Sequence, residues 1–152
     1  MARRFSTGPI REPEIERILE IEASSFGKEA YDRKLFAEYL HKCGDLFLGA
    51  REGRKLCGYM LTHMRADTGR AELVSVAVDP EYRGMGVAST LMESTLRRLR
   101  RRGATRFTLM VKLTNRKARR FYEKYGFSPV RRVPGYYEDG KEGLLMRKVL
   151  RD

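Results

Sequence analysis

Residues 78–93 read VDPEYRGMGVASTLME and join the end of an apolar run to the start of a helical pattern. The turn between them contains Gly84 and Gly86, and glycine accepts backbone conformations that are closed to other residues. A helix that begins directly after such a turn points free backbone N–H groups outward, and these groups bind anions, often phosphates. The stretch therefore predicts an anion-binding turn in front of a helix.

Two common phosphate motifs do not fit this turn. A dinucleotide fingerprint needs three glycines directly after a strand, but Ser89 stands in place of the third and residues 79–83 intervene. A P-loop needs Gly-Lys followed by Ser or Thr, which is absent from the turn. His41 and His63 have neither metal-site nor triad spacing, so we expect structural or surface roles for them and no bound metal.

The spacing of apolar residues predicts the elements of the whole chain. It predicts helices over residues 13–26, 31–44, 86–102 and 116–125, and strands over residues 45–52, 55–66, 71–80, 106–113, 127–133 and 143–150. Asn115 is expected to cap the last helix, and Gly126 with Phe127 to end it. The unit of strand 71–79, helix 86–102 and strand 106–112 predicts a parallel crossover. An α/β or α+β fold with a mixed sheet follows, in a single domain spanning residues 1–152.

Charge and cysteine content narrow the partners and the compartment. The net charge of +12 favours anionic partners, such as nucleic acid, ribosomes or phosphorylated cofactors, and disfavours polycationic substrates. The alternative is a solvated basic surface with no single partner. Two cysteines and the lack of a signal peptide predict a reducing cytoplasm, and no apolar run is long enough to span a membrane.

Several motifs resemble one enzyme family. Arg83-x-x-Gly86-x-Ala88 fits the R/Q-x-x-G-x-G/A signature of the GCN5-related N-acetyltransferases, the GNAT superfamily, and NRKARRFYEKYGF is similar to a later family motif. GYYEDGKEGLLM and SSFGKEAYDRKLF resemble two loops of the branch that acetylates protein N-termini, including the ribosomal-protein alanine (RimI-like) enzymes. The resemblance covers about residues 8–150. It implies a central mixed, mostly antiparallel sheet of six to seven strands with about four helices, splayed between the fourth and fifth strands.

The resemblance implies acetyl-CoA as the donor. Amides of the glycine turn would hold its pyrophosphate, and the preceding strand would hold the pantetheine arm through its backbone. The Val78 amide is a candidate donor to the thioester oxygen, where it would stabilise developing charge. Arg83 can equally be a surface residue. The implied cofactor-binding residues are Val76, Ala77, Val78, Arg83, Gly84, Met85, Gly86, Val87, Ala88, Ser89, Asn115 and Tyr122.

Acetyl transfer needs an acid for the leaving thiolate and a base for the amine. Tyr122 matches the family position of the acid, although it also belongs to an apolar helix stripe that predicts core packing. RimI-like enzymes carry a glutamate in the fifth strand, where this chain has Met110, and a thioether accepts no proton near neutral pH. Glu72 resembles the fourth-strand base of another branch, or it is a surface residue at a strand end. A tyrosine of the late loop acting through ordered water is the third option.

The loss of that glutamate favours one kind of amine. Removing the proton at pH 7 costs about 1.4 kcal/mol for an α-amine of pKa ~8, but about 4.6 kcal/mol for a lysine of pKa ~10.4. We therefore expect an acetyltransferase that acts on a protein N-terminus, and a ribosomal protein is one candidate. The alternatives are a small amine, an aminoacyl-tRNA, or a domain that binds acyl-CoA or RNA without turnover.

Two loops are expected to flank the acceptor peptide. Phe26, Gly27 and Tyr31 belong to the early loop, and Tyr136 with Tyr137 to the late one, where rings pack and hydroxyls donate hydrogen bonds. Ordinary loop packing is the alternative. The arginines between Arg97 and Arg102 either contact RNA or the CoA 3′-phosphate, or form a solvated helix end, which is the usual role of a charge run.

Overall fold

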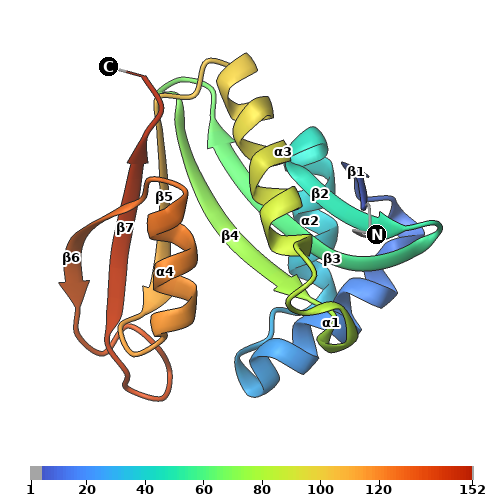
Figure 1. Ribbon diagram of the computed structural model, residues 1–152, viewed down its shortest axis with the longest axis horizontal. Helices are drawn as coiled ribbons and strands as arrows, with labels where there is room; N and C mark the ends of the chain where they lie inside the picture. Colours follow the sequence, from blue (N-terminus) through green and yellow to red (C-terminus); the bar gives the residue numbers. More distant parts are fainter. Residues whose placement is uncertain (1–4, 152) are drawn as a thin grey trace. The chain divides into compact units, whose positions relative to one another are not determined.

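The computed structural model describes residues 5–151, and within them it has seven strands and four α-helices (Figure 1). The strands are β1 (Ser6–Pro9), β2 (Phe47–Glu52), β3 (Lys55–Arg65), β4 (Arg70–Val78), β5 (Arg106–Lys112), β6 (Ser128–Val133) and β7 (Gly143–Val149). The α-helices are α1 (Ile15–Phe26), α2 (Arg33–Cys43), α3 (Val87–Arg101) and α4 (Arg116–Lys124). All four predicted helices and all six predicted strands are confirmed. Strand β1 was not predicted.

The strands form one mixed sheet in the order β1-β2-β3-β4-β5-β7-β6. The pairs β1–β2, β2–β3, β5–β7 and β6–β7 are antiparallel, whereas β4 and β5 are parallel. The predicted strand–helix–strand crossover is thus confirmed, with α3 between the parallel strands in the sequence. The β4–β5 register covers Arg70–Arg106, Ala71–Phe107 and Glu72–Thr108, so it uses only the first residues of β4.

The described chain forms two compact units, of which the first comprises residues 5–63 and 74–102. In this unit, alternate residues of β3 face opposite layers. Tyr59 and Leu61 belong to a core cluster shared with α1 and α2, and the rings of Tyr59 and Phe36 are 5.7 Å apart. Met60 faces the other way and accepts a hydrogen bond from Thr95 of α3 at 3.3 Å. Helices α1 and α2 therefore cover one face of these strands, and α3 covers the other (Figure 1).

The second unit comprises residues 64–73 and 103–151. Its core contains Phe107 of β5, which packs on Phe127 with ring centroids 5.4 Å apart. Helix α4 ends in the predicted Schellman stop, because the Phe127 amide donates to Tyr122 O and the Gly126 amide to Glu123 O. At the other end, Asn115 caps α4 by accepting the Ala118 amide at 3.2 Å, as predicted.

Hydropathy of the helices bears on membrane insertion. In residues 5–151, every helix is either too short or too polar to cross a bilayer.

Candidate active site

The glycine turn between β4 and α3 is exposed, and its backbone adopts conformations that glycine accepts without strain. Gly84 has a φ of 78° and Gly86 a φ of 86°, both in the left-handed region. A Cβ atom built on either glycine would meet no atom within 4 Å. The two glycines thus serve a backbone conformation and leave free space outside the turn. They do not serve close packing inside the protein.

The first turn of α3 has no side-chain cap. Gly86 occupies the N-cap position and has no side chain to offer, and the amides of Val87, Ala88 and Ser89 have no acceptor within the helix. Val87 is buried, whereas Ala88 and Ser89 are half-buried and Met85 is 40% exposed. The uncapped amides and the positive helix end thus follow directly after an exposed glycine turn, which is the arrangement that binds an anion.

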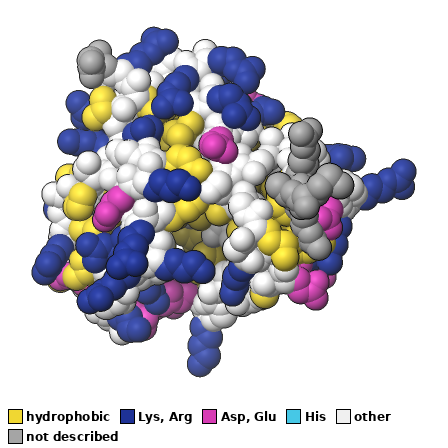
Figure 2. Space-filling model, viewed as in Figure 1, with side chains coloured by type: hydrophobic (Ala, Val, Ile, Leu, Met, Phe, Trp, Pro, Cys, Tyr) yellow, Lys and Arg dark blue, Asp and Glu magenta, His cyan; other side chains and the backbone are white. Residues whose placement is uncertain are grey.

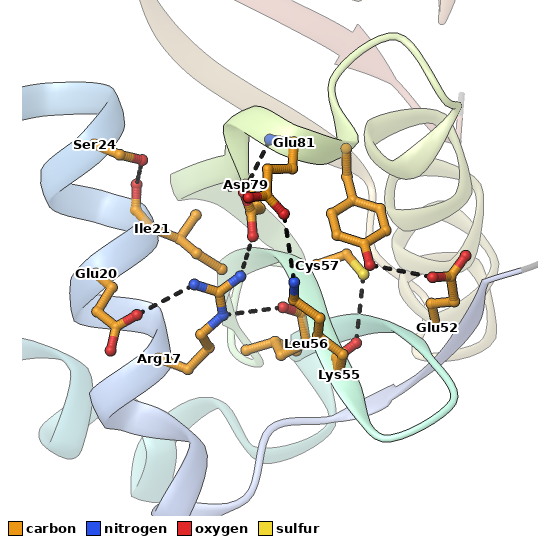
Figure 3. Close-up of polar contacts among 11 residues, drawn as sticks. Arg17, Glu20, Ile21, Ser24, Glu52, Lys55, Leu56, Cys57, Asp79 and Glu81 are labelled. Atoms are coloured by element: carbon orange, nitrogen blue, oxygen red, sulfur yellow. Dashed lines mark hydrogen bonds and ion pairs between the residues drawn. The ribbon is translucent and has the colours of Figure 1, made fainter.

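Asp79, a buried aspartate at the start of the turn, attaches the turn to α1 and β3 (Figure 3). Asp79 Oδ1 accepts the Glu81 amide at 2.9 Å, and Asp79 Oδ2 pairs with the guanidinium of Arg17 on α1. Arg17 also donates to Leu56 O at 3.3 Å, and the Asp79 amide donates to Cys57 O at 2.8 Å. Burial alone would raise the pKa of Asp79, but the Glu81 amide and Arg17 hold it below its usual value.

Two more contacts tie the turn to neighbouring elements. Tyr82 is buried and donates to Glu52 at 3.1 Å, while Lys55 lies 3.6 Å from Glu81 (Figure 3). Arg83 is exposed and donates to the Ser25 hydroxyl of α1 at 3.3 Å. No local sequence pattern indicates the Arg17–Asp79 pair, because the two residues are 62 positions apart.

The end of β4 presents backbone groups on its edge away from β3. The Asp79 amide points toward β3, and since peptide groups alternate along a strand, those of Val76 and Val78 point the opposite way. These residues also lie beyond the three-pair register with β5. On the other side of β4, Gly58 of β3 allows close packing against Ala77 and Val87. A Cβ at position 58 would lie 2.9 Å from Val87 Cγ1 and 3.0 Å from Ala77 O. Val76 and Val78 are half-buried, and Ala77 is buried.

Tyr122 lies in the second unit, on α4, and its ring is packed. It is 7% exposed, and its ring lies 5.4 Å from that of Phe121 and 5.8 Å from that of Phe127. Burial raises the pKa of Tyr122 to about 12, so the phenol is protonated at neutral pH. Among residues 5–151 its hydroxyl has no hydrogen-bond partner. The packed ring and its protonated hydroxyl agree with both roles expected from the sequence, namely the acid for the leaving thiolate and a core-packing residue.

The late loop of the second unit brings the tyrosine pair beside Met110. The rings of Tyr136 and Tyr137 are 5.0 Å apart and nearly perpendicular, and Lys112 Nζ lies 5.1 Å from the Tyr137 ring. A Cβ on Gly143 would lie 2.9 Å from Met110 Sδ and 3.1 Å from Tyr136 Cβ. Glycine at position 143 therefore leaves room for both the Met110 thioether and the Tyr136 side chain next to β7.

Glu72 is exposed on β4, opposite Thr108 of β5 in the parallel register. Its carboxylate therefore lies on the surface of the strand and is not buried. The structure therefore provides no desolvated environment for this side chain, and its role as a base remains a prediction.

The early loop of the first unit is exposed but anchored. Phe26 is 39% and Tyr31 42% exposed, and Gly27 has a φ of 53° with no atom within 4 Å of a built Cβ. The Tyr31 ring packs edge-on against Phe36 at 6.3 Å, and its amide donates to Glu22 Oε2 at 2.8 Å. Glu22 was not singled out from the sequence, because a helical glutamate is normally a surface residue.

The basic end of α3 is partly neutralised. Arg98 donates to Asp45 O at 3.2 Å, and Arg102 pairs with the Asp45 carboxylate at 3.0 Å. On the face that Figure 2 shows, Lys and Arg side chains are spread among acidic and apolar ones. The distribution gives no preference to one RNA-binding patch over a solvated basic surface.

Comparisons with known proteins agree with this geometry. The model of the acetyltransferase (GNAT) family matches residues 14–127. A Bacillus subtilis protein named as a ribosomal protein bS18-alanine N-acetyltransferase is 30% identical over 147 residues, which are 96% of each chain. An N-alpha-acetyltransferase of Saccharolobus solfataricus is 29% identical, with 97% of this chain and 95% of the relative covered.

Two solved structures show the same fold. The crystal structure of Ard1 from Thermoplasma volcanium has a TM-score of 0.91 and 26% identity, covering 97% of this chain and 99% of that one. A chain of the NatB acetyltransferase complex bound to CoA and MES has a TM-score of 0.80 and 28% identity, covering 95% and 98%.

Proposed function

The chain belongs to the acetyltransferase (GNAT) family, and from this premise we propose that it transfers the acetyl group of acetyl-CoA to the N-terminal α-amine of a protein. The observation that carries the proposal is the exposed glycine turn with an uncapped helix start behind it. The relatives named for N-terminal acetylation cover nearly the whole chain. We propose further that residues 1–152 act as one acetyltransferase domain.

The donor would bind along β4 and the turn. Amides between Gly84 and Ser89 would hold the pyrophosphate oxygens, and the outward peptide groups of Val76 and Val78 would pair with the pantetheine arm. The Val78 amide would donate to the thioester oxygen as negative charge develops on it. Asn115 uses Oδ1 as a helix cap, so only its side-chain NH₂ group would be free to donate to the cofactor.

Tyr122 would stabilise the leaving group. As the amine nitrogen bonds to the thioester carbon and the C–S bond breaks, charge collects on sulfur. Complete proton transfer from a phenol of pKa about 12 to a thiolate of pKa ~8.5 would cost about 5 kcal/mol. We therefore expect the hydroxyl to act chiefly as a hydrogen-bond donor to sulfur, with the amine proton neutralising the thiolate afterwards.

The amine is expected to need little help in losing its proton. Met110 beside Tyr136 supplies no base, which suits an α-amine better than a lysine for the energetic reason given above. Glu72, or water held by Tyr136 or Tyr137, remains a candidate to receive the proton. An unchanged pH–rate profile of the Glu72→Gln variant would remove Glu72 from consideration.

The acceptor would be held by Phe26, Gly27 and Tyr31 of the early loop and by the tyrosine pair of the late loop. The chain would work in the cytoplasm, in keeping with two buried free thiols, Cys43 and Cys57. Contact with a ribosome or RNA, favoured by the net charge of +12, would bring the enzyme to a nascent or ribosomal protein.

One assay tests the acceptor class. Release of CoA thiol and product mass are measured with three peptides of otherwise identical sequence. One begins with Ala, one begins with Met, and one has a blocked N-terminus and an internal lysine. We expect acetylation of a free N-terminus and none of the lysine. Acetylation of the lysine alone, or of aminoacyl-tRNA or a polyamine in place of peptides, would refute the proposal. Tight acetyl-CoA binding without turnover would indicate a binding domain.

A further inference from the structure

The sheet of the second unit has a buried face and an exposed face. Phe107 of β5 is buried and packs on Phe127, which in turn packs on Tyr122 of α4, so this face belongs to the core under α4. Side chains alternate along a strand, and Arg106 and Thr108 therefore point to the opposite face. Arg106 is exposed there.

The pairing of the strands shows which residues share this exposed face. Arg70 of β4 lies beside Arg106 of β5 in the parallel register. Arg147 of β7 pairs with Thr108, two positions along β5 from Arg106. Arg131 of β6 pairs with the residue two positions before Arg147 along β7. Paired residues point to the same side of a sheet, so the four arginines form one diagonal line across four strands, which we call the arginine face.

The arginine face is evenly spaced and lacks partners. Neighbouring strands lie about 4.8 Å apart, and diagonal neighbours on adjacent strands lie about 7–8 Å apart. All four arginines are exposed, and within residues 5–151 their guanidinium groups have neither an ion pair nor a hydrogen bond. Among the paired strand residues that the structure describes, Glu72 is the one acid on this face.

Other cations of the same unit have acidic partners close by. Arg65 pairs with Asp67 at 3.4 Å, and Lys112 pairs with Asp139 at 2.9 Å. A solvated protein surface normally mixes both signs of charge in this way. Like charges on adjacent strands are destabilising, so a line of four arginines is costly by itself. A polyanion laid along the line would relieve that repulsion.

We propose that the arginine face binds the phosphate backbone of RNA. The arginine diagonal contains no aromatic side chain, whereas the centre of a protein–protein interface depends on buried aromatic and apolar anchors. The guanidinium fork of arginine matches phosphate geometry, and a row of such forks fits a chain of phosphates. Without aromatic rings for base stacking, the contact reads the backbone and not the sequence. The inference rests on the RNA contact included in the proposed function, and it assigns a surface to that contact.

Binding to a labelled RNA hairpin tests the proposal without any acetyl transfer. Fluorescence anisotropy between about 50 and 200 mM KCl measures the affinity and its salt dependence. Each phosphate contact contributes about 0.9 to the slope of log K against log salt, so four contacts predict a slope of about −3.6 or steeper for the wild type.

The test variant combines Arg106→Gln with Arg147→Gln. We expect at least tenfold weaker RNA binding at about 0.1 M KCl and a slope reduced by about 2, because two phosphate contacts are lost. The matched control combines Arg116→Gln with Arg120→Gln on α4, which packs on the other face of the sheet. Both residues are exposed, and the net charge falls by the same amount. The control should bind RNA within threefold of the wild type.

A charge-preserving variant separates lost contacts from damaged folding. Arg106→Lys with Arg147→Lys should keep the slope within about 0.5 of the wild type, because both charges remain. A Lys variant as weak as the Gln variant, equal losses in the Gln variant and the α4 control, or an unchanged affinity of the Gln variant would overturn the proposal.

Two further outcomes are decisive. A polyglutamate peptide bound more tightly than the RNA hairpin would assign the arginine face to an acidic protein and overturn its assignment to RNA. A wild type that binds RNA as expected but acetylates no peptide would refute the proposed acetyl transfer alone, because RNA binding is measured separately.

Discussion

Adding one methyl group to the glycine turn should weaken donor binding without a matching loss of fold. In Gly86→Ala the new Cβ enters open space at the N-cap of α3, since no atom beyond the two neighbouring residues lies within 4 Å of its position. We expect the new methyl group to overlap an anion bound at the α3 amides, because both would lie at this helix start. Gly53→Ala is the matched control, because Gly53 also has a positive φ, 61°, and open space around a built Cβ.

The expected magnitudes follow from the backbone. An alanine forced into the left-handed region costs about 1–2 kcal/mol, so both variants should lose about 1 kcal/mol or more of unfolding free energy. For a chain of this length, each 1 kcal/mol corresponds to about 2–4 °C in Tm. Only Gly86→Ala should also lose acetyl-CoA affinity, by tenfold or more, because its methyl group displaces the phosphates from the amides.

Calorimetric titration with acetyl-CoA and thermal unfolding of the wild type and both variants give the two quantities. A Gly86→Ala protein with the acetyl-CoA Kd of Gly53→Ala would refute the placement of the pyrophosphate at this turn. A Kd weakened equally in both variants would show that the effect comes from general destabilisation.

Three further predictions concern the chemistry and the support of the site. Tyr122→Phe should lower kcat at least tenfold with an unchanged acetyl-CoA Kd, and an unchanged kcat would exclude the hydroxyl from the reaction. Met110→Glu should raise the rate at pH 6 relative to pH 8 by adding a base beside Tyr136, whereas the matched Met110→Gln should not; identical pH–rate profiles for the two variants would refute this. Asp79→Asn should reduce the Tm at pH 7 and make it less sensitive to acid. The folded-state pKa of Asp79 lies below the unfolded value of ~3.9, so its stabilisation is present above that pH and is lost as the pH falls through the folded-state value. An equal drop in Tm between pH 7 and pH 3 for variant and wild type would contradict that origin.

Local patterns in the sequence determined the elements of this protein. The apolar stripe of α3, the Asn115 cap and the Gly126 stop depend on residues within a few positions of one another, so they are legible without the fold. The glycine turn is local in the same sense, because its shape requires positive φ at Gly84 and Gly86. Strand β1 shows the limit of local signals. Its four residues carry no alternation, and they become a strand only by pairing with β2.

Only the tertiary structure decided which charged residues are buried. Glu22, Arg51 and Asp79 lie in segments that read as surface or strand end, yet all three are nearly inaccessible to solvent. Their partners lie far away in the sequence: Ser75 is 53 residues from Glu22, and Arg17 is 62 residues from Asp79. A charge is stable in the interior only where such partners replace its water. Because folding alone brings those partners together, the support of both loops around the site could not be read from the sequence.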